Sequence, residues 1–348
     1  MAEVEIGWWP LDRVPELQAF VDAEFRTGHV LARDRELLQW QHPLDGERLS
    51  VAGATVDDEL VGILGAIRFD ASVRGDTVPG VWLTTWAASP AWRSQQVGLR
   101  LLEFVAASAP IAGTVGGNDT TIRILAALRY DVCRSMPRWV LPLDAVALTR
   151  LGVRTTATEP PRADADVDVA RSLSPALADG WDETWATRVA PSVVATWRDA
   201  SYVRRRYLEH PRFRYDTRWA VEDGVPTALL VTRLERVADV DASVLRILEA
   251  IGDERAVTAL ATQAARDAAA AGAAFADFYC TSERFAAPLV EAGFAPDETF
   301  PNRFQPFERR PRPLSIALRL ADEAATRGVL AEGDAYFTKS DCDQDRPS

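Results

Sequence analysis

Hydrophobic and polar residues along the chain form two successive series of strand and helix patterns. Apolar residues recur every three or four positions where we predict a helix, and alternate or run together where we predict a strand. The first series is predicted as a helix at 14–25, strands at 49–56, 60–69 and 78–88, a helix at 97–107, a strand at 111–115, a helix at 120–128 and a closing strand at 138–143.

The second series repeats this order. It is predicted as helices at 181–189 and 201–209, strands at 218–222, 227–235 and 244–250, a helix at 254–271, a strand at 275–280 and a helix at 282–292. Three landmarks recur at nearly the same offset: His42-Pro43 with His210-Pro211, Arg68 with Arg233, and Tyr130 with Phe294. We interpret this as an internal duplication; the alternative is coincidence between two generic α/β patterns.

A polar segment separates the two series. Residues 155–168, TTATEPPRADADVD, mix Pro, Thr and Asp without an apolar period, which is typical of a linker. The sequence therefore predicts an N-terminal domain at 1–154, the linker at 155–168 and a C-terminal domain at 169–348. The expected class is α/β, with two tandem domains that each contain a mixed, mostly antiparallel sheet flanked by helices.

Charge and cysteine content narrow the function. The 348 residues carry a formal net charge of −12, which argues against nucleic-acid binding because that binding neutralises phosphates with basic side chains. Three cysteines without a CxxC spacing predict neither a disulfide framework nor a zinc site. No basic leader and no apolar run of roughly 18 residues occurs. We expect a cytoplasmic, soluble protein without a membrane partner.

The most informative stretch is 84–102, TTWAASPAWRSQQVGLRLL, which is a buried strand, a proline-containing turn and a loop that begins a helix. Free amides at such a helix start form an anion site that a diphosphate fits. A side chain at position 98 would obstruct close approach of the ligand, which explains Gly98.

This loop resembles the signature of the GNAT acyltransferases, which is Arg or Gln, two residues, Gly, one residue, then Gly or Ala. Arg93, Gln96 and Gly98 stand at the matching positions, and Gln96 replaces the first glycine. Asn118 and the Arg129-Tyr130 pair fall where the family has an Asn and a Gly-Phe pair, so the resemblance covers about 50–143. It implies acyl-CoA as co-substrate and no metal. The implied cofactor residues are Trp86, Ala87, Ala88, Arg93, Ser94, Gln95, Gln96, Val97, Gly98, Leu99 and Asn118.

The resemblance also implies an amine acceptor. In the family, amides of the strand before the loop polarise the thioester carbonyl, and a tyrosine seven residues after the Asn often protonates the thiolate; here that position is Leu125. The second series has two acids at Asp253 and Glu254, so we expect it to have lost CoA binding and to shape the acceptor site. The whole chain is similar to tandem GNAT enzymes that acylate nucleotide-linked amino sugars. The alternatives are a natural-product or aminoacyl amine as acceptor, and a noncatalytic acyl-CoA-binding scaffold.

Three residues are candidates for the group that deprotonates the amine: His42, His210 and Asp341, of which we favour His210 and Asp341. The ordinary interpretation of each histidine is an imidazole that bonds a helix-terminal carbonyl. An acidic C-terminal tail such as 341–345 is more often a solvated end than a site. Trp86 is either a core residue or a wall of the acyl pocket, and Arg204–Arg206 either decorate a helix or hold an acceptor diphosphate. The oligomeric state, including a homodimer, stays open.

Overall fold

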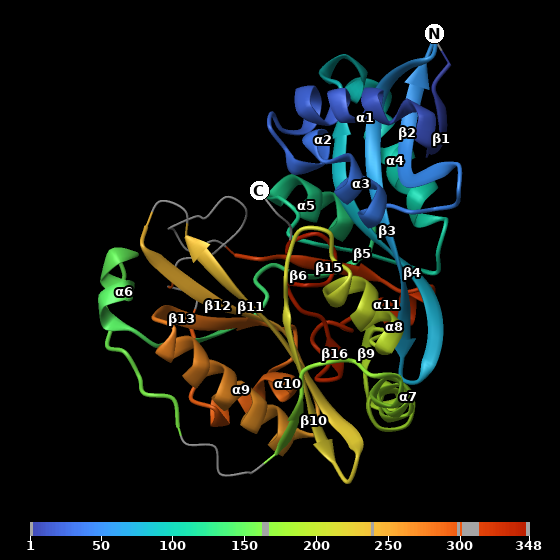
Figure 1. Cartoon of the computed structure of the whole chain (residues 1–348). Helices are drawn as coiled ribbons and strands as arrows, with labels where there is room; N and C mark the ends of the chain where they lie inside the picture. Colours follow the sequence, from blue (N-terminus) through green and yellow to red (C-terminus); the bar gives the residue numbers. More distant parts are fainter. Residues whose placement is uncertain (1–2, 162–166, 238–239, 298–299, 301–312, 346–348) are drawn as a thin grey trace.

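A computed structural model of the chain describes residues 3–161, 167–237, 240–297, 300 and 313–345. The C-terminal segment lies between two β-sheets, and helices cover the outer face of each sheet (Figure 1). The expected class, an α/β chain with two mixed, mostly antiparallel sheets flanked by helices, is confirmed. In each sheet one neighbouring pair in the middle is parallel, β4 with β5 and β12 with β13.

The two sheets have the same strand order. Along the first sheet run β1 (Glu5–Pro10), β2 (Arg48–Val56), β3 (Glu59–Val73), β4 (Asp76–Ala88), β5 (Ile111–Val115), β15 (Ile316–Arg319) and β6 (Asp131–Cys133). Along the second run β8 (Asp168–Ala170), β10 (Asp216–Glu222), β11 (Val225–Val237), β12 (Ala242–Gly252), β13 (Ala273–Tyr279), β7 (Arg138–Pro142) and β14 (Ala295–Pro296). The first sheet also includes β9 (Val194–Thr196), which pairs with β3, and β16 (Ala335–Tyr336), which pairs with β9.

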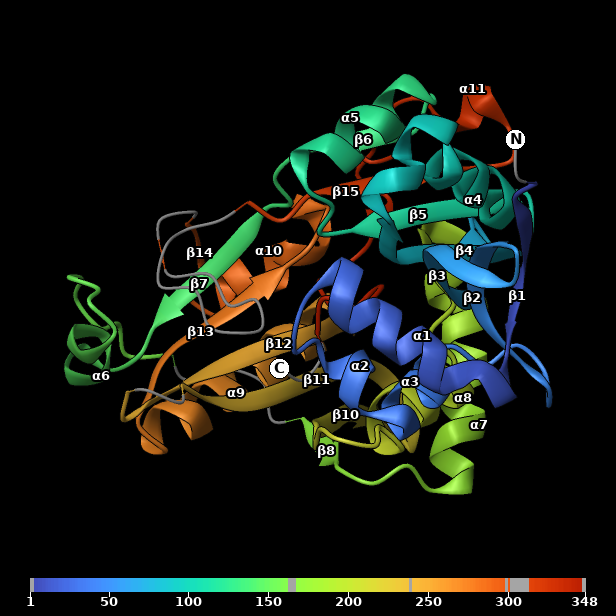
Figure 2. The ribbon, with the colours of Figure 1, turned by 90° about the horizontal axis from the view of Figure 1, so that it is seen from above.

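The sixth strand of each sheet comes from the other half of the chain. In the first sheet β15 pairs with β5, placing Ile316 opposite Val115, and in the second β7 pairs with β13, placing Val140 opposite Asp277. Figure 2 shows β7 beside β13, and β15 beside β5. The strand predicted at 138–143 therefore forms, but the expectation that it closes the first sheet is wrong. Its partner is set by contacts between distant segments, which periodicity does not report.

Several helices begin where a side chain caps the first turn. Asn118, Asp144, Ser174 and Asp253 each accept a hydrogen bond from the backbone N–H three residues later. The helices are α1 (Val14–Phe20), α2 (Val30–Arg33), α3 (Arg35–Gln41), α4 (Val97–Ala106), α5 (Asp119–Ala127), α6 (Ala145–Arg150), α7 (Pro175–Thr184), α8 (Ala200–Val203), α9 (Glu254–Ala270), α10 (Glu283–Glu291) and α11 (Glu323–Thr326). Single π-helical turns continue three of them, at Val21–Phe25, Trp185–Val189 and Arg204–Leu208.

The first sheet buries both of its faces. Val51 of β2 belongs to the core formed with α1 and α3, whereas its neighbour Ala52 belongs to the core formed with α4. This alternation follows from the two-residue period of a strand, which points successive side chains to opposite faces. Leu101 of α4 is fully buried in the second of these cores. Both faces of the sheet are therefore fixed around the start of α4, where the candidate loop lies.

Within the described residues, no helix combines the length and apolar composition that crossing a lipid bilayer would require.

Candidate active site between the two sheets

Strand β4 contains a bulge at the position where the candidate site begins. Ile63 of β3 pairs with Ala87 and Gly65 pairs with Thr84, so Leu64 faces two residues, Thr85 and Trp86. Thr85 takes a positive φ of 34°, which a β-branched residue rarely adopts. A bulge bends the strand and increases its twist, and such bulges often lie next to active sites.

Just before this bulge, after Trp82, β4 separates from β5. The two strands pair at Gly80–Trp82 with Ile111–Gly113, and no further backbone pair joins them in the described part of the chain. Thr114 Oγ1 donates to the Leu83 carbonyl at 2.9 Å, which bridges the point of divergence. The gap opens into a cavity of about 180 Å³, here called the splay cavity. Its walls are Phe25, Leu64, Leu83, Thr84, Thr85, Trp86, Thr114, Val115, Gly116, Gly117, Asn118, Thr121, Leu125, Asp343 and Gln344.

Two buried hydroxyl groups in this wall have no hydrogen-bond partner among the described residues. They are Thr84 Oγ1 and Thr85 Oγ1, on side chains that are 5% and 8% exposed. Leaving a buried hydroxyl unpaired costs about 1–3 kcal/mol. A ligand in the splay cavity that accepts hydrogen bonds from these two hydroxyls would remove that cost. Sequence patterns did not single out these threonines because each fits an ordinary buried strand.

The loop before α4 has the geometry of an anion site. A 3₁₀ turn spans Pro90–Gln95, and Gln96 then takes a left-handed conformation, with φ 57° and ψ 26°, as the N-cap of α4. Its side chain makes no capping hydrogen bond, so the first-turn N–H groups stay available. Such N–H groups together with the helix dipole favour phosphate. The left-handed backbone also explains why related loops have a glycine at the position of Gln96.

Gly98 has a second role that the sequence did not reveal. A Cβ at this position would lie 3.3 Å from Trp86 Nε1, and Trp86 Nε1 donates to the Gly98 carbonyl at 3.1 Å. The absence of a side chain thus lets the indole of Trp86 pack on α4. Trp86 also lines the splay cavity, so it connects the loop before α4 to the wall of the cavity.

Of the other predicted cofactor residues, one lines the splay cavity and the rest lie outside its wall. Asn118 lines it, and its Oδ1 caps α5 by accepting from Thr121 N at 2.9 Å. Arg93 donates from Nε to the Ala88 carbonyl at 3.2 Å, which fastens the loop to the end of β4. The remaining predicted residues do not line the cavity and belong to the strand end, the loop and the first turn of α4: Ala87, Ala88, Ser94, Gln95, Gln96, Val97, Gly98 and Leu99.

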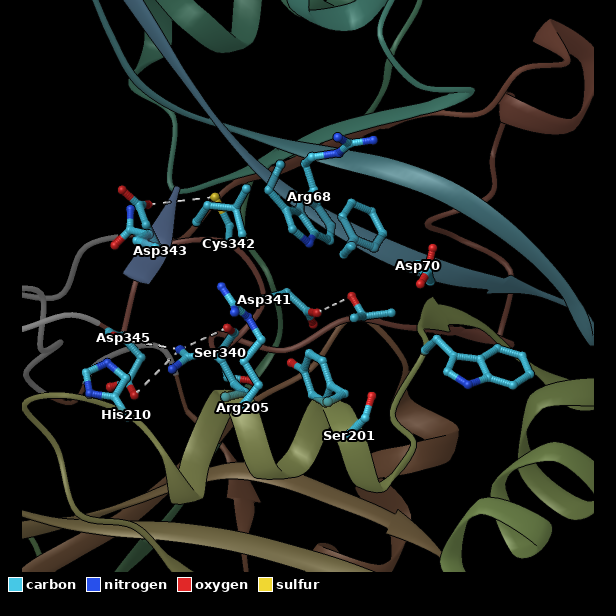
Figure 3. Close-up of a pocket in the computed structure, with 18 of the residues that line it drawn as sticks. Arg68, Asp70, Ser201, Arg205, His210, Ser340, Asp341, Cys342, Asp343 and Asp345 are labelled. Carbon is cyan, nitrogen blue, oxygen red and sulfur yellow. Dashed lines mark hydrogen bonds and ion pairs between the residues drawn. The ribbon is translucent and has the colours of Figure 1, made fainter. Parts of the chain in front are cut away.

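A second cavity, of about 220 Å³, lies between the two sheets and is here called the aromatic cavity. Its aromatic walls are Trp40, Phe69, Trp82, Trp197 and Tyr202. The residues labelled in Figure 3 come from three segments: Arg68 and Asp70 of β3, the α8 region with Ser201, Arg205 and His210, and the tail from Ser340 to Asp345. The tail thus lies between the strand above and the helix below.

His210 lines the aromatic cavity but has its Nδ1 occupied. That nitrogen accepts backbone N–H groups of Arg212 at 3.1 Å and Phe213 at 2.9 Å. Burial, and then the charge of Arg206, lower the pKa of His210 to about 3, so the ring is neutral at pH 7. Since Nδ1 is an acceptor, the proton of the neutral ring resides on Nε2. His210 can therefore donate a hydrogen bond into the cavity.

His42 does not line either cavity. Its Nδ1 lies 3.1 Å from the Ala66 carbonyl and its Nε2 lies 3.0 Å from Gln41 Nε2, so Nδ1 carries the proton and Nε2 accepts. Burial lowers its pKa to about 4. The ring of His42 thus bonds a carbonyl of strand β3 and not the helix-terminal carbonyl of the ordinary interpretation.

The acidic tail is buried, so its interpretation as a solvated end is wrong. Asp341 is 2% exposed, and its Oδ1 accepts from Thr196 Oγ1 at 2.5 Å while its Oδ2 accepts from Arg198 Nη2 at 2.7 Å. Asp345 accepts from Arg233 and Tyr215, and the pKa of its carboxyl is well below the ordinary value because these partners outweigh burial. Both aspartates anchor the tail between the sheets.

Asp343, between these two anchors, was missed as an individual residue. Its Oδ1 accepts from Gln344 Nε2 at 2.9 Å, and its side chain lines both cavities. No sequence signal distinguishes it from Asp341 or Asp345, because all three alternate along one short tail.

The corresponding position on the second sheet is filled by protein groups. Where the first sheet presents the end of β4, the second presents the end of β12, and there Ala250 N donates to Tyr336 Oη at 3.0 Å. At the start of α9, Asp253 Oδ1 accepts from Ala256 N at 3.0 Å. A carboxylate thus caps the start of α9, whereas no side chain caps the start of α4.

Solved structures that are similar to this chain include acyltransferases. A GCN5-related N-acetyltransferase from Anabaena variabilis ATCC 29413 aligns with a TM-score of 0.61 and 12% identity over 92% of this chain and 73% of that one. A GCN5-related N-acetyltransferase from Kribbella flavida gives 0.59 and 16% over 93% and 72%. Saccharomyces cerevisiae N-myristoyltransferase with bound myristoyl-CoA gives 0.56 and 13% over 92% and 79%.

These similarities establish the fold: the chain is built like the GNAT acyltransferases, as the loop resemblance predicted. A scan of protein-family models gives no match, and a search of curated proteins gives none.

Proposed function

We propose that this protein is an acyl-CoA-dependent N-acyltransferase that acylates the amine of a nucleotide-linked amino sugar by direct transfer. The observation that carries the proposal is that two cavities with different linings share one residue. The splay cavity is lined by Trp86, which packs on the start of α4, and the aromatic cavity is lined by other residues of the tail; Asp343 lines both. A donor and an acceptor bound in these cavities would approach each other at this residue.

The splay cavity suits acyl-CoA. The diphosphate would bind to the first-turn N–H groups of α4, as in other helix-start phosphate sites. The pantetheine arm would then lie along the end of β4, where Trp86 to Ala88 have no β5 partner within the described residues. Thr84 and Thr85 would donate to carbonyl oxygens of the donor. Amides and hydroxyls placed at the thioester oxygen stabilise the charge that develops there during attack.

The aromatic cavity suits a sugar with a charged substituent. Trp40, Trp197 and Tyr202 provide flat faces on which a sugar ring stacks. Arg68 and Arg205 provide guanidinium groups for a diphosphate. Of the sequence candidates, His210 would donate from Nε2 to an acceptor oxygen, and Asp341 would hold the tail in place through Arg198.

We propose that the reaction takes place in the cytoplasm. No disulfide joins the cysteines of the described residues, which supports a reducing cytoplasm as the setting. The residues that line both cavities belong to one chain. The proposed reaction therefore does not require a homodimer.

The decisive experiment is calorimetric titration with acetyl-CoA and with a long-chain acyl-CoA. Saturable binding of either supports the donor site, and the next measurement is CoA release in the presence of a nucleotide-linked amino sugar, the corresponding free amino sugar or a simple aminoacyl amine. Turnover with the first alone supports the proposed acceptor. Turnover with only simple amines favours a different amine acceptor, binding without turnover favours a scaffold, and no binding refutes the enzymatic proposal.

A further inference from the structure

Asp343 is the one side chain of the described chain that lines both the splay cavity and the aromatic cavity. It belongs to the C-terminal tail and is 6% exposed. In Figure 3 it lies beside Cys342, beneath the strand that carries Arg68 and above the helix that carries Arg205. A carboxylate at this junction would contact the acceptor amine at the point where the amine reaches the thioester.

We propose that Asp343 is the catalytic base that deprotonates the acceptor amine. This inference rests on the proposed acyl transfer and names a residue for it. The two other tail aspartates are committed to anchoring: Asp341 binds Arg198 and Thr196, and Asp345 binds Arg233 and Tyr215. Neither of them lines the splay cavity.

The proton balance requires one base. An amine acceptor enters as an ammonium ion, and Asp343 takes one proton from its nitrogen. The freed electron pair forms the N–C bond to the thioester carbonyl carbon, whose oxygen becomes negatively charged. Collapse of this intermediate reforms the C=O bond and breaks the C–S bond, and the thiolate leaves with the electron pair. The second nitrogen proton passes to the thiolate, which yields the amide and CoA, and Asp343 releases its proton to solvent.

Charged groups line the aromatic cavity together with Asp343. Arg205 and Arg206 line it from the helical side, Asp341 and Asp345 line it from the tail, and the neutral imidazole of His210 shares the cavity. His42 lies behind the cavity wall, close enough for the Asp343 charge to act on its ring.

The test compares Asp343→Asn with Asp179→Asn, which makes the same chemical change on the exposed face of α7. Both variants are assayed with acetyl-CoA and two acceptors: the amine that the wild type acylates best, and hydroxylamine, which is largely unprotonated at neutral pH. For the first acceptor, Asp343→Asn should lower kcat by about 10²- to 10⁴-fold. For hydroxylamine the loss should be much smaller, because no ammonium proton needs to be removed. Asp179→Asn should match the wild type with both.

A structural role for Asp343 predicts a different result, because a displaced tail would reduce both reactions equally. Equal losses, or full activity of Asp343→Asn, therefore overturn the inference while the acyl transfer of the wild type stands. Acetyl-CoA titration shows whether the variant keeps its donor site. If Asp343→Asn does not fold, Asp343→Glu and Asp343→Gln form the same comparison, with activity expected in the carboxylate variant alone. A wild type that acylates no amine overturns both the inference and the proposed function.

Discussion

Arg198 donates from Nη2 to Asp341 Oδ2 at 2.7 Å, and this ion pair joins the C-terminal tail to the segment between the two sheets. Both side chains are fully buried, and Arg198 Nε also donates to Glu249 Oε2 at 2.8 Å. Burial alone would lower the pKa of Arg198, but the two carboxylates outweigh it and raise that pKa well above its ordinary value. The tail that carries Asp343 is therefore positioned by buried charge.

Replacing Asp341 tests this anchor. Asp341→Asn leaves Arg198 with Glu249 as its single carboxylate and should lower the free energy of unfolding by about 3 kcal/mol. Urea unfolding measures the change. Asp45→Asn, which removes an exposed partner of Arg48, is the control and should cost less than about 1 kcal/mol. Similar losses in the two variants would contradict a structural role for the buried pair.

The backbone at Gln96, in the loop before α4, is strained. Its φ of 57° lies in the region that a non-glycine residue occupies at a cost of roughly 1–2 kcal/mol. Gln96→Gly should therefore stabilise the fold by about 0.5–1 kcal/mol after the extra freedom of glycine in the unfolded chain is subtracted. Acetyl-CoA affinity should be kept or improved. Gln95→Gly, one residue earlier in the 3₁₀ turn, should instead destabilise by about 0.5–1 kcal/mol. The same sign for both would refute the strain.

Gly98 should be essential for donor binding. In Gly98→Val the new Cβ would stand 3.3 Å from Trp86 Nε1, so the indole would have to shift and its bond to the Gly98 carbonyl would weaken. We expect acetyl-CoA affinity to fall by about tenfold or more, which corresponds to roughly 1.4 kcal/mol. Calorimetry gives the dissociation constant. Gly46→Val, where an added Cβ meets open space, should leave the affinity unchanged; an unchanged Gly98→Val would move the donor site elsewhere.

The buried His42 should make stability depend on pH. Its pKa is about 4 in the folded protein and roughly 6.5 in an unfolded chain. Between these values the unfolded chain binds a proton that the folded protein does not, so the free energy of unfolding falls as pH drops from 6.5 to 4, by on the order of 3 kcal/mol. His42→Asn, whose amide can also donate to the Ala66 carbonyl, should reduce this slope by up to one proton. Urea unfolding at several pH values measures it, and an unchanged slope would exclude His42 as its source.

The local pattern of the sequence determined most elements and part of the site. Strands 49–56 and 111–115 and helix 254–271 were predictable because their residues bury one face or run continuously through a core, and that periodicity is a property of neighbouring residues. The loop from Arg93 to Gly98 was found for the same reason, since a strand, a turn and a helix start are adjacent in the chain.

Only the tertiary structure decided which distant segments meet. The exchange of β7 and β15 between the sheets depends on backbone partners more than a hundred residues apart, and no period encodes a partner. The burial of the acidic tail depends on Arg198 and Arg233, which neutralise it from other segments. For that reason the sequence could name Asp341 but could not show that Asp343 stands where the two cavities meet.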